Sequence, residues 1–203
     1  MKDVETLSRF LPDGAVEQVY QWIKEHRVHF RITRARNTKL GDYRPPSTKG
    51  GTHRITVNHD LNTYAFLITF VHELAHLRIH EQYGRSVRPH GLEWKKEYRS
   101  LMLPFLDSGI FPKDIQSVLR KSLNNARASS TGDLALSRVL ARYDKPSDHQ
   151  HLEDLGQDQV FITTSGRRFR KGERIRTRIK CLNLDNRRYY LFHPLTRVML
   201  VTA

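Results

Sequence analysis

The sequence contains a single cysteine, Cys181, in 203 residues, and this scarcity limits the class of protein. One cysteine cannot form an intramolecular disulfide, so a small secreted domain held together by disulfides is excluded. No apolar run reaches the roughly 18 residues of a membrane-spanning helix. The charged start, Met1 to Thr6, also lacks the basic-then-apolar layout of a secretory signal. We therefore expect a cytoplasmic protein that does not associate with membranes.

Acidic residues are also scarce, and their scarcity is uneven along the chain. The 35 lysines and arginines outnumber the 21 aspartates and glutamates, which gives a formal net charge of +14. Residues 1–103 hold 17 basic and 11 acidic side chains, residues 104–158 hold 7 and 8, and residues 159–203 hold 11 and 2. The last segment therefore carries most of the excess charge and is suited to a polyanionic partner.

Composition and the positions of proline and glycine divide the chain into three parts. Hydrophobic residues make up 38% of the chain, enough for a folded core, so a disordered polyelectrolyte is excluded. We predict a first domain over residues 1–125 and a basic β module over residues 159–203. Residues 126–158 between them are interpreted as a short helix followed by an acidic, polar linker that contains proline and glycine.

The spacing of apolar residues predicts an α+β fold for the first domain. Helical periodicity predicts helices over about residues 14–26, 63–80, 91–103, 113–124 and 133–142. Alternating periodicity predicts strands over residues 28–33, 39–44 and 54–58. The helix that starts at Thr63 is apolar on nearly every side, which is typical of a helix buried in the core. The polar residues within it are His72, Glu73 and His76. They must then have polar partners inside the protein, because unpaired buried polar groups are costly.

These three polar residues form an HExxH motif on a predicted helix. Four residues are about one helical turn, so His72 and His76 project from the same face with their Cβ atoms roughly 6 Å apart. Two imidazoles so placed can bind one Zn²⁺ ion, and Glu73 lies where it can take a proton from a water molecule on the metal. The motif therefore predicts a zinc-dependent hydrolase.

A catalytic zinc site needs a third protein ligand, and the residues alone leave several candidates. His80 continues the row of histidines, but it lies about 12 Å along the helix from His72, too far to share one ion with both ligands. Glu93 or Glu97 could serve from the following helix. His90 is better placed, because Pro89 and Gly91 on either side of it indicate a turn that directs the ring back across the metal helix.

The order and spacing of these residues resemble a known family. An HExxH motif followed after about a dozen residues by His90-Gly91-x-x-Trp94 is similar to the SprT-like zinc metallopeptidases, over about residues 1–125. The resemblance implies a zincin-like catalytic domain with one catalytic Zn²⁺ held by His72, His76 and His90, and with Glu73 as the catalytic residue. The family includes Spartan-type proteases, which degrade proteins trapped covalently on DNA. It therefore implies a peptidase of the DNA–protein crosslink repair type, with protein substrates and DNA as a partner.

The C-terminal module departs from the family pattern. Many SprT-like proteins end in a zinc ribbon with two cysteine pairs, which one cysteine cannot supply, so we interpret residues 159–203 as a degenerate ribbon that packs Cys181 in its core. We predict turns at residues 165–166, 171–172 and 185–186, and one strand over residues 174–181 with its basic residues on one face. The predicted nucleic-acid-binding residues are Arg167, Arg168, Arg170, Lys171, Arg174, Arg176, Arg178 and Lys180.

Three questions stay open at this point. The chain could instead be a non-catalytic nucleic-acid-binding protein with zinc, or a general intracellular metallopeptidase without DNA. Tyr64, His80 and Tyr98 are equal candidates for stabilising an oxyanion. The strand over residues 52–58 could align an extended substrate by strand addition, or could be a plain part of the sheet.

Overall fold

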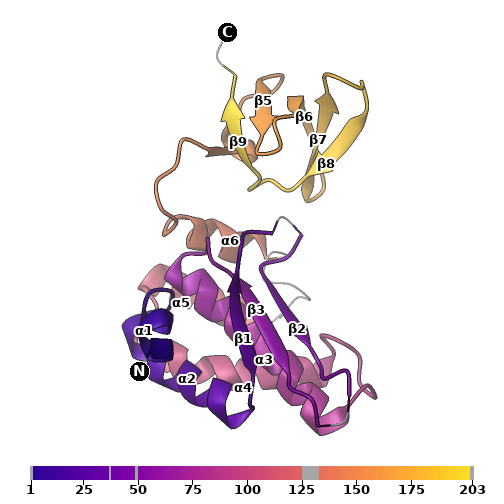
Figure 1. Ribbon diagram of the computed structural model, residues 1–203. Helices are drawn as coiled ribbons and strands as arrows, with labels where there is room; N and C mark the ends of the chain where they lie inside the picture. Colours follow the sequence, from indigo (N-terminus) through magenta and orange to yellow (C-terminus); the bar gives the residue numbers. More distant parts are fainter. Residues whose placement is uncertain (1, 37, 49, 125–132, 202–203) are drawn as a thin grey trace. The chain divides into compact units, whose positions relative to one another are not determined.

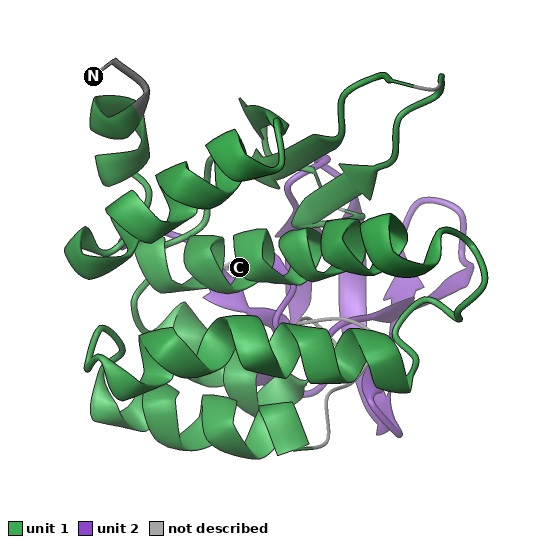
Figure 2. Cartoon of the chain, turned by 90° about the horizontal axis from the view of Figure 1, so that it is seen from below, with its two compact units in different colours: residues 1–144 green, residues 145–203 purple. Residues whose placement is uncertain are grey.

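The computed structural model describes residues 2–36, 38–48, 50–124 and 133–201. It divides the chain into two compact units, unit 1 over residues 1–144 and unit 2 over residues 145–203 (Figure 2). Unit 1 contains both helices and strands. The described part of unit 2 contains strands and one short 3-10 turn. The expected α+β class is confirmed.

Unit 1 contains six helices and three strands among the described residues (Figure 1). In chain order these are α1 (Lys2–Ser8), the 3-10 turn η1 (Asp13–Ala15), α2 (Val16–Glu25), β1 (His29–Thr33), β2 (Gly41–Arg44), β3 (Arg54–Asn58), α3 (Thr63–Tyr83), α4 (Leu92–Asp107), α5 (Lys113–Asn124) and α6 (Leu134–Ala141). The predicted strand 54–58 and helix 113–124 have the observed bounds. Helix α1 was not predicted, because its seven residues are too few to show a helical period.

The three strands form one sheet in the order β1-β3-β2. Strand β3 pairs in parallel with β1 and antiparallel with β2. Because both edges of β3 are already hydrogen-bonded, it cannot add a substrate strand, and the hypothesis that it aligns substrate is wrong. The free edges of the sheet belong to β1 and β2.

Helix α3 forms the centre of the unit 1 core. Its first three turns are buried almost completely, as the apolar sequence predicts. Asn62 caps the helix: its side-chain oxygen accepts a hydrogen bond from the backbone N–H of Ala65 at 2.9 Å. The Asn62 amide also donates to the Leu140 carbonyl and to the Asp144 carboxylate, at 2.9 and 2.7 Å. These bonds tie the end of α6 to the start of α3.

Unit 2 is a six-stranded antiparallel sheet with a short 3-10 turn. Its elements are β4 (Gln150–His151), η3 (Leu152–Asp154), β5 (Val160–Thr163), β6 (Arg168–Ile175), β7 (Arg178–Asn183), β8 (Tyr189–Phe192) and β9 (Arg197–Leu200). The strand order is β4-β9-β5-β6-β7-β8. Phe161, Phe169 and Cys181 are among its buried residues, so the expectation that Cys181 packs in the core is confirmed.

The division between the units differs from the predicted boundaries at 125 and 158. Helix α6, predicted to lie in the connecting segment, packs with unit 1 through the bonds of Asn62. At the other end of that segment, β4 pairs with β9, and η3 contributes the buried Leu152 to unit 2. The predicted linker therefore contains structured parts of both units, because hydrogen bonds and strand pairing with distant segments are not visible in its local composition.

The predicted single strand over residues 174–181 is wrong. Residues Arg176 and Thr177 form a turn, with Arg176 at a φ of 53°, and β6 and β7 pair as a hairpin on either side of it. The predicted turn at residues 171–172 is instead inside β6, at a bulge where the register shifts. A methyl group on Gly172 would lie 2.6 Å from the Lys180 carbonyl oxygen, so glycine permits a close approach of the strands here.

No helix in the described part of the chain has both the length and the hydropathy to cross a bilayer.

Candidate metal centre

Helix α3 brings the three residues of the HExxH motif to one region of the core. His72 and Glu73 are each only 9% exposed, and His76 is partly buried one turn later. The rings of His72 and His76 have their centroids 5.0 Å apart, as the helical spacing predicts. The sequence therefore places two imidazoles and one carboxyl group inside the protein within five consecutive positions of one helix.

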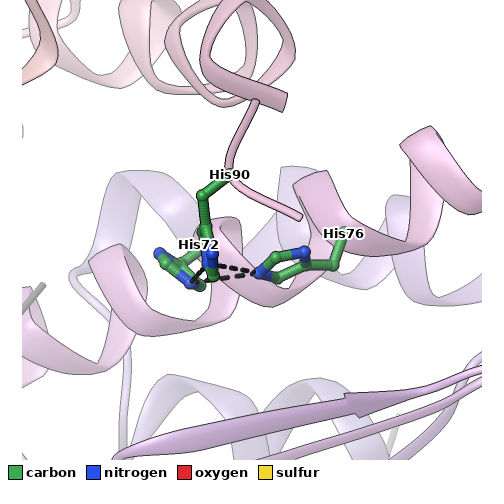
Figure 3. Close-up of side chains that lie close together, drawn as sticks. All are labelled: His72, His76 and His90. Carbon is green, nitrogen blue, oxygen red and sulfur yellow. Dashed lines mark hydrogen bonds between the residues drawn. The ribbon is translucent and has the colours of Figure 1, made fainter. Parts of the chain in front are cut away.

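His90 reaches the same region from the turn before α4. The Gly91 N–H donates to the Arg88 carbonyl at 2.9 Å, which closes the turn, and His90 takes the left-handed conformation with a φ of 60°. This conformation is unfavourable for a residue with a side chain, by roughly 1–2 kcal/mol. The fold maintains it, and the His90 ring points toward α3 (Figure 3).

The Nε2 atoms of the three histidines form a closed triangle (Figure 3). Their separations are 3.3 Å for His72 and His76, 2.9 Å for His76 and His90, and 3.2 Å for His72 and His90. A proton on one nitrogen can be shared with the others, but no choice of tautomers makes all three contacts into hydrogen bonds. At least one contact must join two lone pairs or two N–H groups.

A metal ion resolves this conflict, because it accepts a lone pair from every nitrogen. Tetrahedral zinc with Zn–N bonds of about 2.0–2.1 Å holds its nitrogen ligands about 3.3 Å apart, close to the observed separations. The donor set of three imidazoles fits zinc chemistry. His72, His76 and His90 therefore could hold a metal ion.

The other candidates for the third ligand do not belong to the metal-suited group of the described structure. Glu97 is engaged with Arg78, whose Nε atom is 3.0 Å from its carboxylate, and neither Glu97 nor Glu93 belongs to the metal-suited group. His80 contacts the rings of Tyr43 and His53, with centroids about 6 Å away. The preference for His90 over these residues agrees with the geometry.

Trp94 contacts the back of the histidine cluster. Its ring centroid lies 4.6 Å from that of His72, 5.2 Å from His76 and 4.7 Å from His90. Tyr98 stacks on its other side at 5.0 Å. Trp94 therefore limits the orientations of all three imidazoles, a role that the sequence analysis did not assign to it. Its indole nitrogen is buried with no hydrogen-bond partner in the described structure.

Burial keeps the three imidazoles neutral. Together with the positive charge of neighbouring histidines, which contributes less, burial lowers the pKa of His72 from 6.5 to about 3 and that of His76 to about 4. Burial also lowers the pKa of His90. Neutral imidazoles have a free lone pair, so the site is ready to bind a cation at neutral pH.

Strand β2 passes directly over Glu73. A methyl group added to Gly41 would lie 2.8 Å from both Cγ and Oε1 of Glu73 and 2.7 Å from the Thr69 methyl carbon. The strand can come this close only because residue 41 is glycine. Sequence analysis did not identify Gly41, because nothing near it in the chain reveals the contact.

The surroundings of Glu73 make its carboxyl group a weak acid. Burial raises the pKa of Glu73 from 4.5 to about 7. A hydrogen bond from the Tyr43 backbone and the positive charges of Arg36 and Lys39 act in the opposite direction, and Asp42 adds to the rise. A pKa near neutrality suits a group that both accepts and returns a proton.

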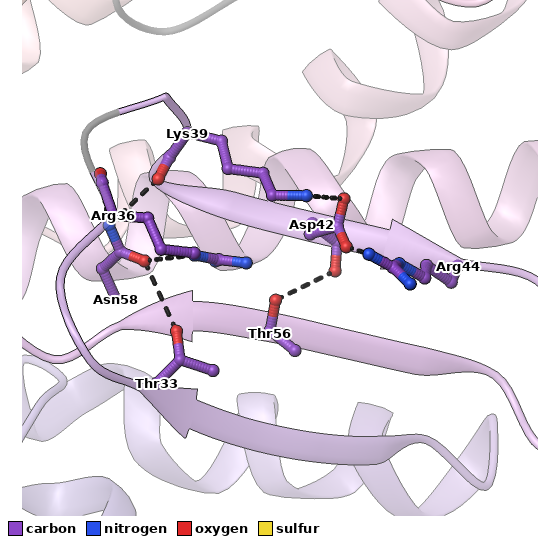
Figure 4. Close-up of polar contacts among 7 residues, drawn as sticks. All are labelled: Thr33, Arg36, Lys39, Asp42, Arg44, Thr56 and Asn58. Carbon is purple, nitrogen blue, oxygen red and sulfur yellow. Dashed lines mark hydrogen bonds and ion pairs between the residues drawn. The ribbon is translucent and has the colours of Figure 1, made fainter.

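A polar network holds the loop between β1 and β2 beside this site (Figure 4). Asn58, only 1% exposed, accepts from the Arg36 side chain at 2.8 Å and donates to the backbone carbonyls of Arg36 and Lys39. Lys39 and Arg44 both pair with Asp42 at 2.8 Å. One η nitrogen of Arg36 is buried without a partner in the described structure.

Residues 13–108 match the model of the SprT-like family. This segment is similar to a SprT-like domain. Comparisons with curated proteins and with solved structures gave no match. The match to this family together with three metal-suited histidines supports a metallopeptidase-like function.

The SprT-like domain contains the whole candidate centre. Its bounds run from η1 to the end of α4, and they include Gly41, the HExxH motif, His90 and Trp94. The match is shorter than the expected resemblance over residues 1–125. Unit 2 lies outside the SprT-like match, so its role rests on its own residues.

The residues proposed to stabilise an oxyanion are dispersed around the SprT-like domain. Tyr64 packs on Phe111 and Tyr143, with ring centroids 6.0 and 5.1 Å away. Tyr98 is buried behind Trp94, with its ring 5.7 Å from that of His72, and burial raises its pKa. His80 lies against Tyr43.

The basic residues predicted to bind nucleic acid fall on different parts of unit 2. Strand alternation places four of them opposite the core residues, on a surface that we call the β6–β8 outer face: Arg168, Arg170, Arg178 and Lys180. The β6–β8 outer face also contains Tyr189 and Leu191, 63% and 59% exposed, and the Lys180 ammonium lies 4.4 Å from the Tyr189 ring centroid.

The other four predicted residues lie off this face. Lys171 points to the core side, where its ammonium donates to the carbonyls of Glu153 and Leu155. Arg174 pairs with Ile179 on the core side of the hairpin, and Arg176 lies in the turn. Arg167 is exposed in the loop before β6. The predicted row of four basic residues does not form, because the hairpin turn interrupts it.

Proposed function

We propose that this protein is a zinc-dependent endopeptidase with a zincin-like catalytic domain in unit 1. The observation that carries the proposal is the convergence of three Nε2 atoms at 2.9–3.3 Å beside a buried glutamate of raised pKa. His72, His76 and His90 would hold the ion, and Glu73 would act as general base. Three protein ligands suit a catalytic site, because structural zinc sites use four.

The chemistry would be hydrolysis of an amide bond. Zinc, when bound, supplies a lowered pKa for a water molecule and polarises the scissile carbonyl. Glu73 accepts the proton of the attacking water and returns it to the leaving nitrogen. The contacts with Gly41 and the Tyr43 backbone restrict the Glu73 side chain to one position, which favours proton transfer over a short path.

We further propose that the substrates are proteins bound or crosslinked to DNA. The support is the β6–β8 outer face, which carries four cations and an exposed tyrosine, with the Lys180 ammonium 4.4 Å from the tyrosine ring centroid. Cations neutralise phosphates and an aromatic ring stacks on unpaired bases, so the combination suits single-stranded DNA. The alternatives are a non-catalytic zinc protein that binds nucleic acid and a metallopeptidase without DNA.

The first experiment is to measure metal content and cleavage of a DNA-bound protein, with and without single-stranded DNA. For Glu73→Gln we expect stoichiometric zinc but a rate lower by about 10²–10⁴-fold, the range typical of a lost general base. Glu81→Gln, a matched change on the same helix, should cleave normally.

The outcomes distinguish the candidate functions. Cleavage by Glu73→Gln at the native rate would remove Glu73 from the mechanism. Zinc without any cleavage in the native protein would favour the non-catalytic alternative. Cleavage that DNA does not affect would favour a peptidase without a DNA partner.

A further inference from the structure

The sheet of unit 1 has arginines on one face of all three strands. The register places His29 of β1 beside Arg54 of β3, and Arg54 directly opposite Arg44 of β2. Arg31 lies two residues further along β1, on the same face as His29. Neighbouring strands are about 4.8 Å apart and alternate residues about 6.6 Å apart, so these side chains share one small area. We call these four residues the cationic sheet face.

This face points away from the helices of unit 1. The alternate residues of the central strand, Ile55 and Val57, are fully buried in the core that contains α3. His29, Arg31 and Arg44 are exposed, and the Arg44 side chain has 58% of its surface accessible. The helices pack on the other side of the sheet (Figure 1).

Acidic side chains compensate little of this charge. Asp42 is the only acidic residue on the three strands, and it is shared between Lys39 and Arg44 (Figure 4). No ion pair joins Arg31 or Arg54 to an acidic group within the described ranges. Like charges directly opposite each other destabilise a sheet, and Asp42 pairs with Arg44 but with neither Arg31 nor Arg54, so these two arginines are the cations of this face that an anion would bind.

We propose that the cationic sheet face is a second nucleic-acid site, which binds the phosphate backbone of single-stranded DNA. Arginine presents planar donors that match phosphate oxygens. An acidic protein partner fits less well, because protein interfaces depend on buried apolar and aromatic anchors. None of the exposed large hydrophobic residues of the described chain lies on this face.

The proposal goes beyond the proposed function because it places a DNA contact in the SprT-like domain itself. The loop that joins β1 to β2 carries Arg36 and Lys39, which lie near enough to Glu73 to lower its pKa. The same loop follows the last residue of β1, two positions beyond Arg31. A strand of DNA on the cationic sheet face would therefore lie on the domain that holds the catalytic carboxyl group.

The test measures binding of the full-length protein to a fluorescent single-stranded oligonucleotide at several salt concentrations. Each phosphate contact adds about 0.7 to the slope of log affinity against log salt. We expect Arg31→Gln/Arg54→Gln to reduce the slope by about 1.4. Arg31→Lys/Arg54→Lys, which keeps both charges, should retain the native slope.

A charge-matched control uses exposed cations on other elements, Arg9→Gln/Lys121→Gln. If this control lowers the slope as much as Arg31→Gln/Arg54→Gln does, the effect is one of net charge and the proposal is overturned. Equal binding of polyglutamate, with the same response to the substitutions, would also overturn it, because the face would then be a general polyanion surface.

The two DNA surfaces can be tested separately. Arg170→Gln/Lys180→Gln removes cations from the β6–β8 outer face, and we expect the two pairs of substitutions to reduce the slope additively. If only the unit 2 pair has an effect, the cationic sheet face is not a site although the proposed function stands. If only Arg31→Gln/Arg54→Gln has an effect, the second site stands and the unit 2 part of the proposed function fails.

Photo-crosslinking of the native protein provides a measurement that needs no substitution. An oligonucleotide with photoreactive thymidines should crosslink to peptides from β1 and β3 as well as to peptides from unit 2. Crosslinks that map to unit 2 alone would overturn the proposal.

Discussion

Glu73 is held between a helix and a strand that approach each other at a glycine. The contact of Gly41 with the Glu73 side chain has no spare room, since a methyl group there would lie 2.8 Å from two of its atoms. The three imidazoles are restrained in a similar way by Trp94. Close packing around reactive groups keeps them in one geometry.

Gly41→Ala should therefore displace Glu73 without removing the metal ligands. We expect kcat to fall by about 100-fold, the effect of roughly 1 Å of misplacement, while zinc content is unchanged. Steady-state kinetics and metal analysis on the same preparation test this. The control is Gly156→Ala in unit 2, whose kcat should equal that of the native protein. Gly50→Ala is less suitable, because Gly50 has a φ of +84° and alanine would strain the backbone there. A normal kcat for Gly41→Ala would show that the strand adjusts.

His90→Ala should weaken zinc binding by more than the 10–100-fold that the loss of a supporting group causes. His80→Ala is the matched control, because His80 lies on the same metal helix but contacts Tyr43 and His53. Competition with a chromophoric chelator measures both affinities. Native affinity in His90→Ala would exclude His90 as a ligand.

At the scale of elements, helix α3 depends on the residue that caps its start. Asn62 caps α3 through its oxygen and ties the α6 segment through its amide nitrogen. One side chain thus joins a local interaction to two contacts about 80 positions away in the sequence. The cap is predictable from the chain, and the long-range bonds are not.

Substitutions at Asn62 should separate these two roles. Asn62→Ala should cost about 2 kcal/mol of unfolding free energy, about 1 from the cap and about 1 from the lost amide bonds. Asn62→Ser keeps a capping oxygen and should cost about 1 kcal/mol. Urea unfolding followed by tryptophan fluorescence provides the measurement. Equal losses for both variants would mean that the cap contributes nothing, and no loss in Asn62→Ser would mean the same of the amide bonds.

At the scale of the whole molecule, the two units carry separate probes of their own stability. Both tryptophans, Trp22 and Trp94, lie in unit 1, and the only cysteine lies in the core of unit 2. Each unit has its own buried apolar cluster. Separate cores allow separate unfolding transitions.

We expect denaturation to give two transitions, with tryptophan fluorescence reporting unit 1 and alkylation of Cys181 reporting unit 2. Burial raises the pKa of the Cys181 thiol from 9.0 to about 11. The folded unit 2 then binds the thiol proton more tightly than the unfolded chain, so its stability is full below pH 9 and declines as the pH rises toward 11. Cys181→Ala should remove this decline. Coincident transitions for both probes would show that the units unfold together.

The metal site illustrates how much the chain predicts. The helical spacing of His72 and His76 determines their common face, and His90 stands out because a turn must redirect the chain there. The roles of Gly41, Trp94 and the Tyr43 backbone could not be predicted, because these residues meet the motif only through packing across 18 to 32 positions of sequence.

The sequence by itself determined the helix and strand periods, the HExxH geometry and the concentration of positive charge, because each depends on neighbours a few residues apart. Only the tertiary structure decided which strand is central, where the hairpin in unit 2 turns, and that the arginines of three separate strands share one face of a sheet. These features depend on strand pairing between distant segments, and local patterns carry no information on register.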